Sequence, residues 1–278
     1  DLVATASCDS TIKVWDTTNG RARSTLRGNS GQPMLGVDIN GGLVAGCSSD
    51  KMIRIWSLKT DRMIHQLVGH MNKVTCVRFS PDSRSVVSAS ADRSIKVWDI
   101  ARHTYKVNTT MRHGSTSNCI DVGSDGLTIA TGHMDGGIRL WDMRKGDRST
   151  EIRSIHTGGV TSVQFDPKNS NVLLTNGRDS SISFSDIRMG SVVQTLQHKN
   201  FRTTFNWSSA SFSANGMYVV AASGMNGDTF IWRTDDGYLE KHLVSHNQGV
   251  GGVAWGGGGT NGQQVATVDR SGVLVLWS

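Results

Sequence analysis

Short segments with an apolar residue at every second position recur along the chain, each bounded by turn-forming residues. The clearest is Ile95–Asp99, in which Ile95 and Val97 share one face of a strand and Lys96 and Trp98 share the other, because side chains on a strand alternate with period two. Both faces carry bulky side chains. The pattern therefore predicts strands that are covered on both sides.

The sequence around this segment predicts one four-stranded unit. Each strand has four to six residues between turn formers, and we expect them over Val74–Phe79, Ser85–Ser90, Ser94–Asp99 and Tyr105–Thr109. A lone sheet of this kind would leave one apolar face in water. Stacked sheets cover both faces and protect the edges, so each unit needs its neighbours.

The unit repeats along the whole chain, and its third strand ends at Trp15, Trp56, Trp98, Trp141, Ser185, Trp232 and Trp277. A period of roughly 40 to 45 residues that closes on Trp-Asp is typical of a WD-repeat propeller with four strands per blade. We therefore predict an all-β fold, a seven-bladed WD-repeat β-propeller of four-stranded antiparallel blades. It should form one domain over residues 1–278.

The first and last blades should be incomplete, with three strands each. Because Asp1–Ser7 corresponds to the second strand of a repeat, we expect this sequence to be a piece of a longer protein whose upstream region is absent. The missing inner and outer strands would then come from upstream of Asp1. The expected ring has a gap or a truncated seam where Asp1 and Ser278 meet.

Histidine and aspartate recur at set distances before the tryptophan in repeats three, four and seven. The three sets are His70, Asp92 and Trp98; His113, Asp135 and Trp141; and His246, Asp269 and Trp277. In WD-repeat proteins such residues form a hydrogen-bonded network with a strand Ser or Thr, and the resemblance implies the same here, with Ser88 or Ser90 as the hydroxyl in repeat three. An active site needs convergence rather than one copy per blade, so we interpret the sets as structural.

Three repeats depart from this pattern. Repeat two has Asn29 in place of the histidine, repeat five has Ser185 in place of the tryptophan, and repeat six turns at Met225-Asn226-Gly227 without the aspartate. Repeat five is the weakest blade by its pattern. The long connection Lys199–Trp207, which contains three aromatic residues, follows it.

Composition and charge narrow the functional classes. With 37% hydrophobic and 19% charged residues and only 3 Pro, the chain is not a disordered tail. No apolar run is long enough to span a bilayer, so any membrane contact should be indirect. The net charge of +6 is spread over every repeat, and its densest stretches lack interleaved aromatic residues, so we do not expect nucleic-acid binding.

Motifs of enzymes and metal sites are not apparent. The four cysteines fall singly in the first four repeats without zinc-ligand spacing, so we expect no metal and no structural disulfide. Gly256–Gly259 lies between two predicted strands, Val250–Trp255 and Gln264–Val268, which is the setting of a hairpin turn and not of a phosphate loop. We predict a protein without catalytic residues or cofactors.

Arginine follows the repeat aspartate by two residues in repeats four and five, at Arg144 and Arg188. Such pairs resemble the WD-x-Arg box of substrate receptors for cullin ubiquitin ligases. Alternatively, the arginine caps a turn or forms an ion pair with the aspartate, as is common in WD repeats.

The order of normal and degenerate repeats resembles the propeller of the autophagy-related protein 16 family. The strongest stretches are Gly132–Arg144, Arg178–Arg188 with its tryptophan lost, Phe201–Trp207, Ala210–Ser223, Val253–Trp255 and Val273–Trp277. The resemblance implies a cytoplasmic, non-catalytic scaffold of the machinery that attaches a ubiquitin-like protein to membrane lipid, recruited to autophagic or endosomal membranes. The contact with the conjugation complex would lie in the missing upstream region.

The same resemblance implies a docking surface for proteins on the rim of the propeller. It would include Asn118, before an inner strand, and Met134, in the turn between second and third strands. Animal relatives have a lysine where this chain has Gly159, so a contact that depends on that lysine is not expected to be kept. A substrate receptor and a scaffold of another assembly remain alternatives, because fold alone does not separate them.

Overall fold

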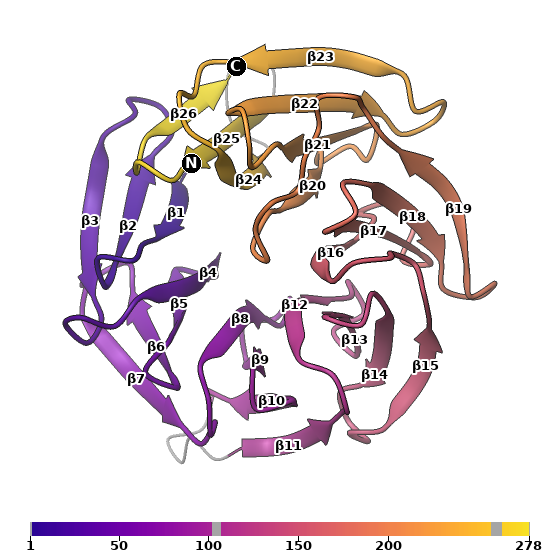
Figure 1. The fold of residues 1–278 in the computed structure, drawn as a ribbon. Coiled ribbons are helices and arrows are strands. Elements are labelled where there is room, and N and C mark those ends of the chain that lie inside the picture. The colour runs from indigo at the N-terminus through magenta and orange to yellow at the C-terminus, as the bar shows by residue number, and fades with distance from the viewer. Residues whose placement is uncertain (1, 102–106, 257–262, 278) are drawn as a thin grey trace. The chain divides into compact units, whose positions relative to one another are not determined.

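A computed structural model describes residues 2–101, 107–256 and 263–277. These residues form 26 strands and no helix (Figure 1). The first four sheets are β1(Leu2–Ala6), β2(Thr11–Asp16), β3(Ala22–Arg27); β4(Met34–Asn40), β5(Leu43–Ser48), β6(Met52–Ser57), β7(Met63–Val68); β8(Val74–Phe79), β9(Ser85–Ser90), β10(Ser94–Asp99), β11(Val107–Arg112); and β12(Ser117–Val122), β13(Thr128–His133), β14(Ile138–Asp142), β15(Arg148–Ile152).

The last three sheets follow in the same strand order as the chain. They consist of β16(Val160–Phe165), β17(Val172–Gly177), β18(Ile182–Asp186), β19(Ser191–Leu196); β20(Ala210–Phe212), β21(Tyr218–Ala222), β22(Asp228–Arg233), β23(Leu239–Val244); and β24(Val250–Gly256), β25(Gln264–Asp269), β26(Leu274–Trp277). The first and last sheets have three strands and the other five have four. The predicted fold class, a seven-bladed β-propeller with incomplete first and last blades, is confirmed.

The strand bounds given in the sequence prediction agree with the structure to within one residue, except in one outer strand. The strand expected over Tyr105–Thr109 is observed as β11, which pairs with β10 from Ser94↔Arg112 to Trp98↔Val107 and so extends three residues further. Tyr105 lies outside the described residues, as does most of the predicted hairpin turn at Gly256–Gly259.

The chain divides into two compact units, Asp1–Ile129 with Leu140–Ser149 and Ala130–Arg139 with Thr150–Ser278. In the first unit, the third sheet is covered on both faces. Trp98 packs in one apolar cluster with Ile53 and Ile55 of β6, whereas its neighbour Val97 packs in another with Ile120 and Ile129. The alternation along β10 therefore joins the third sheet to the sheets on either side of it.

In the second unit, the repeat with the lost tryptophan still forms a complete sheet. All five residues of β18 are buried, and Phe184 of this strand lies 5.8 Å from Phe212 of β20 between ring centroids. Phe184, Phe212 and Trp232 belong to one apolar cluster. Packing against the sixth sheet thus stabilises a blade that its own pattern predicts to be weak.

The turns between second and third strands place the repeat aspartates. Asp92 accepts the backbone N–H of Ser94 at 2.9 Å, and Arg93 between them has a φ of 64°. The same arrangement occurs around Asp179, where Ser180 has a φ of 61°. An aspartate that caps its own turn in this way favours the left-handed residue that follows.

Candidate functional site

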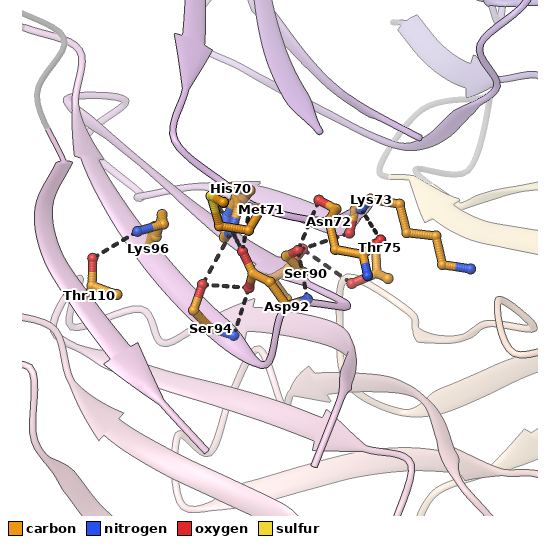
Figure 2. A network of polar contacts seen from close by, with 12 residues as sticks. His70, Met71, Asn72, Lys73, Thr75, Ser90, Asp92, Ser94, Lys96 and Thr110 are labelled. Atoms are coloured by element: carbon orange, nitrogen blue, oxygen red, sulfur yellow. Dashed lines mark hydrogen bonds and ion pairs between the residues drawn. The ribbon is translucent and has the colours of Figure 1, made fainter. Parts of the chain in front are cut away.

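Four side chains of repeat three form a continuous hydrogen-bonded chain; Figure 2 shows the part around Asp92. Trp98 Nε1 and His70 Nε2 each lie 2.8 Å from Oγ of Ser88, and His70 Nδ1 lies 2.9 Å from Asp92 Oδ2. An indole N–H only donates and a carboxylate only accepts. The hydroxyl of Ser88 therefore accepts from Trp98 and donates to Nε2 of His70, whose Nδ1–H donates to Asp92.

Of the two hydroxyls considered for this network, the structure uses Ser88. Ser90 instead donates to the backbone carbonyls of Asn72 and Lys73, at 3.1 and 2.9 Å. Ser88 pairs with Lys96 across the β9–β10 ladder, so its side chain lies on the face of the sheet that carries Trp98. Period-two alternation places Ser90 on that face as well, but beside the turn.

Burial and hydrogen bonding hold this network in one protonation state. Burial lowers the pKa of His70, although Asp92 acts in the opposite direction. Burial disfavours the ionised form of Asp92, but hydrogen bonds from Ser94, the N–H of Met71 and His70 outweigh it and lower its pKa to about 2. At neutral pH the imidazole is neutral and the carboxylate charged, which matches the donor order above.

Repeat seven has the same geometry. His246 Nδ1 lies 3.0 Å from Asp269 Oδ2, and Nε2 lies 2.7 Å from the hydroxyl of Thr267, which also accepts from Trp277 Nε1 at 3.0 Å. The histidine and aspartate side chains are 0% and 2% exposed. The two repeats thus bring together the residues that the sequence analysis grouped.

Repeat five contains a network that the sequence analysis missed. His156 contacts Asp179 at 3.0 Å through Nδ1 and Thr175 at 2.9 Å through Nε2. The predicted sets are defined by their spacing to the tryptophan, and this position is Ser185 in repeat five. A separation of 23 residues between histidine and aspartate, the same as between His246 and Asp269, could have identified the pair without it.

In repeat four, the aspartate binds an arginine of the next strand. Asp135 accepts from Arg139 Nη1 and Nη2 at 3.0 and 2.6 Å, and the same guanidinium binds Glu151 at 2.7 Å. His113 Nδ1 accepts the N–H of Ser115 at 3.0 Å. Trp141 is buried among apolar residues that include Met111 and Ile129.

Repeat six replaces the polar network with aromatic packing. Phe201 stands 31 residues before Trp232, the same spacing as from His246 to Trp277. It is fully buried, and its ring meets those of Phe230 and Trp232 edge to face, with centroids 5.9 and 5.7 Å apart. At this position of the blade, packing of aromatic rings takes the place of the hydrogen bonds of a histidine.

The two rim residues differ in exposure. Asn118 lies half-buried on β12, and Met134 is 46% exposed in the turn after β13. A Cβ added at Gly159 would lie 3.3 Å from the Cα and Sδ atoms of Met134. Any side chain at position 159 would therefore press on Met134, and glycine leaves the methionine accessible.

The two arginines after the repeat aspartates are both exposed, but their described contacts differ. Arg188 Nη2 and Nε lie 2.8 and 3.3 Å from the carboxylate oxygens of Asp186. Arg144 donates its backbone N–H to Asp142 at 2.8 Å. The pairing of Arg188 favours the structural interpretation of this motif over a ligase box.

Chemistry at these sites is limited by what the side chains already bind. The imidazoles of His70, His156 and His246 use both ring nitrogens within their networks. Within residues 2–101, 107–256 and 263–277, no three His, Cys, Asp or Glu side chains cluster in a way that could hold a metal ion. No helix in the described part of the chain could cross a membrane.

Comparison with known families identifies the repeats. The model of the WD domain, G-beta repeat, matches residues 1–16, 20–57, 61–99, 105–142 and 149–186, more than half of the chain. The chain belongs to the WD-repeat family. The two WD repeats that the match does not reach are those closed by Trp232 and Trp277.

Two curated relatives resemble this WD-repeat chain along most of its length. Protein tipD of Dictyostelium discoideum is 35% identical over 252 residues, which cover 90% of this chain and 40% of the relative. Autophagy-related protein 16 of Arabidopsis thaliana is 34% identical over 277 residues, 99% of this chain and 53% of the relative. The predicted resemblance to autophagy-related protein 16 is confirmed.

A different WD-repeat relative matches only in part. Nuclear distribution protein nudF 1 of Talaromyces marneffei is 39% identical over 103 residues, 35% of this chain and 22% of the relative. The chain spans about half or less of the length of each relative named here.

Proposed function

We propose that this WD-repeat propeller is the non-catalytic docking platform of an autophagy-related protein 16-like component of the autophagy lipid-conjugation machinery. The observation that carries the proposal is the likeness to autophagy-related protein 16 of Arabidopsis thaliana along 99% of the chain. The propeller would bind proteins, as peptides or flat surfaces, and a region outside this sequence would hold the conjugation complex. Its place of action would be the cytoplasm, at autophagic or endosomal membranes.

The geometry supports docking in preference to catalysis. The repeated histidines and aspartates form hydrogen bonds with each other and with strand hydroxyls, so they stabilise blades. Several exposed apolar residues lie instead in turns, among them Met134, which is 46% exposed. Turns on a rigid scaffold are where binding residues concentrate in proteins.

Recruitment of the tagged full-length protein to forming autophagosomes under starvation tests this function. We expect punctate recruitment that weakens several-fold in Met134→Asp and persists in Met189→Asp, a control methionine that is 71% exposed in the turn after β18. A uniform cytosolic signal of the wild-type protein under starvation would contradict the proposal.

A further inference from the structure

The connection between β19 and β20 is anchored at its start by buried contacts. Phe201 is fully buried against Phe230 and Trp232. Two residues later, the hydroxyl of Thr203 donates to Asn176 Oδ1 at 3.0 Å, and both side chains are buried. The segment that follows therefore leaves the core from a fixed point.

That segment presents two stacked aromatic rings. Phe205 and Trp207 lie 5.2 Å apart between centroids with an interplanar angle of 6°, and Trp207 is 62% exposed. A Cβ at Gly224 would lie 3.0 Å from the Phe205 ring, and one at Gly251 would lie 3.0 Å from Trp207 Nε1. Two glycines thus leave room for the rings close to the backbone.

Two exposed arginines border this aromatic pair. The Arg270 guanidinium lies over the Phe205 ring, 5.1 Å from its centroid. Arg178 Nη1 donates to the carbonyl of Thr204 at 2.7 Å and to Asn206 Oδ1 at 3.1 Å. In the part of the chain that the structure describes, neither arginine forms an ion pair with a carboxylate.

The carboxylates next to these arginines in sequence face the interior. Asp179 and Asp269 bind His156 and His246, and their side chains are 18% and 2% exposed. In these turns the carboxylates therefore point inward, and the guanidinium groups of the neighbouring arginines lie at the surface. The result is a rigid apolar platform with a positive border.

We propose that Phe205, Trp207, Arg178 and Arg270 form a docking site for an acidic peptide segment that lays an aromatic or aliphatic side chain on the exposed face of Trp207. Trp and Arg are among the residues that contribute most to the energetics of protein interfaces, and a guanidinium group that has no carboxylate partner of its own can bind one in bidentate geometry. A membrane surface is the less suitable occupant, because Trp207 is stacked on the Phe205 ring of its own loop and does not belong to an apolar face of the kind that inserts into a bilayer.

The same unit contains a built-in control. Tyr238 is 62% exposed, and the Arg233 guanidinium lies 5.2 Å from its ring centroid, so this pair resembles Phe205 and Arg270. Here, however, Arg233 forms ion pairs with Asp235 and Asp236. An acidic ligand would be repelled by these carboxylates, so this second aromatic site should not take it.

Selection of random 12-residue display peptides on the 278-residue chain tests the site. We expect the selected peptides to carry an excess of Asp and Glu around one aromatic or aliphatic residue. Their affinity, measured by fluorescence polarisation, should fall about tenfold or more in Trp207→Ala and in Arg270→Glu, and should decrease with salt. Tyr238→Ala should bind as the wild type does, and equal urea midpoints will show that all variants are folded.

Three results would overturn the proposal. One is that no peptide is selected; another is that the selected peptides lack acidic residues; the third is that they bind Trp207→Ala and wild type alike. Vesicles with and without phosphatidylserine provide the membrane arm, and Trp207-dependent vesicle binding without peptide binding would assign the surface to lipid. The proposal does not depend on the autophagy role, because recruitment in cells and peptide binding in solution are separate measurements with separate variants.

Discussion

The indole N–H of Trp98 donates to the hydroxyl of Ser88, ten residues earlier in the chain, at 2.8 Å. The same ten-residue relationship joins Trp277 to Thr267 at 3.0 Å and Trp15 to Thr5 at 2.9 Å. It follows from the antiparallel hairpin, in which the second and third strands place a hydroxyl and an indole on one face. Where a blade lacks the hydroxyl or the indole, the remaining group must form another hydrogen bond or be buried without one.

We expect the two buried serines Ser88 and Ser185 to respond oppositely to alanine. Ser88→Ala removes the acceptor of Trp98 and the donor to His70, and should lower the free energy of unfolding by about 1–3 kcal/mol. The Ser185 hydroxyl is buried without a hydrogen-bond partner among the described residues, so Ser185→Ala should leave stability unchanged or raise it by up to ~1 kcal/mol. Urea titrations followed by tryptophan fluorescence measure both, and a loss in Ser185→Ala as large as in Ser88→Ala would refute the assignment.

His70→Ala should destabilise the chain, whereas the equivalent change in repeat two should not. Removing the imidazole takes away the acceptor of the buried Ser88 hydroxyl and one of the donors to Asp92, and leaves a cavity, at a cost of about 2–4 kcal/mol. Asn29 occupies the corresponding position in repeat two and is exposed, so Asn29→Ala is the matched control. Thermal denaturation of both variants decides the matter, and equal shifts in Tm would argue against a network specific to repeat three.

Stability should fall with acid in two stages. The pKa of His70 is lower in the folded protein than its ordinary value, so its contribution is present above about pH 6.5 and is lost as the pH falls through the folded pKa. Asp92 has a pKa of about 2 in the folded protein, so its contribution is present above about pH 4 and is lost toward pH 2. Urea midpoints between pH 7.5 and 5 should vary less in His70→Gln, and an unchanged slope would contradict the lowered pKa.

Repeat six should reject the histidine that repeats three, five and seven contain. For the imidazole of Phe201→His, the positions that correspond to Ser88 and Asp92 are Ala222, which has no hydroxyl, and Asn226, which has no carboxylate. Burial of an unsatisfied polar ring should cost about 2–4 kcal/mol. Phe201→Leu keeps the site apolar and is expected to cost less. A lower urea midpoint for Phe201→Leu than for Phe201→His would contradict the replacement of the polar network by apolar packing.

The alternation of side chains and the regular period predicted the seven blades, their strand number and most strand bounds, because each repeat carries its own local signals. The histidine and aspartate positions of repeats three and seven could also be inferred, since their spacing to the tryptophan is nearly constant. The pair of His156 and Asp179 was not predicted, because the tryptophan from which the spacing is counted is missing in repeat five. In β11, the observed shift depends on pairing with β10, which a local pattern of turn residues does not encode.

The period, the turns and the polar positions are local properties of the chain, set by residues within about 30 positions of each other. Other features depend on contacts between separate blades and loops. They are the packing of Phe201 in place of a histidine, the choice of the hydroxyl that binds His70, and the surface shared by Phe205, Trp207, Arg178 and Arg270. Packing decides these features, because a side chain in a strand or loop has the same sequence signature whether its neighbours bury it or leave it exposed.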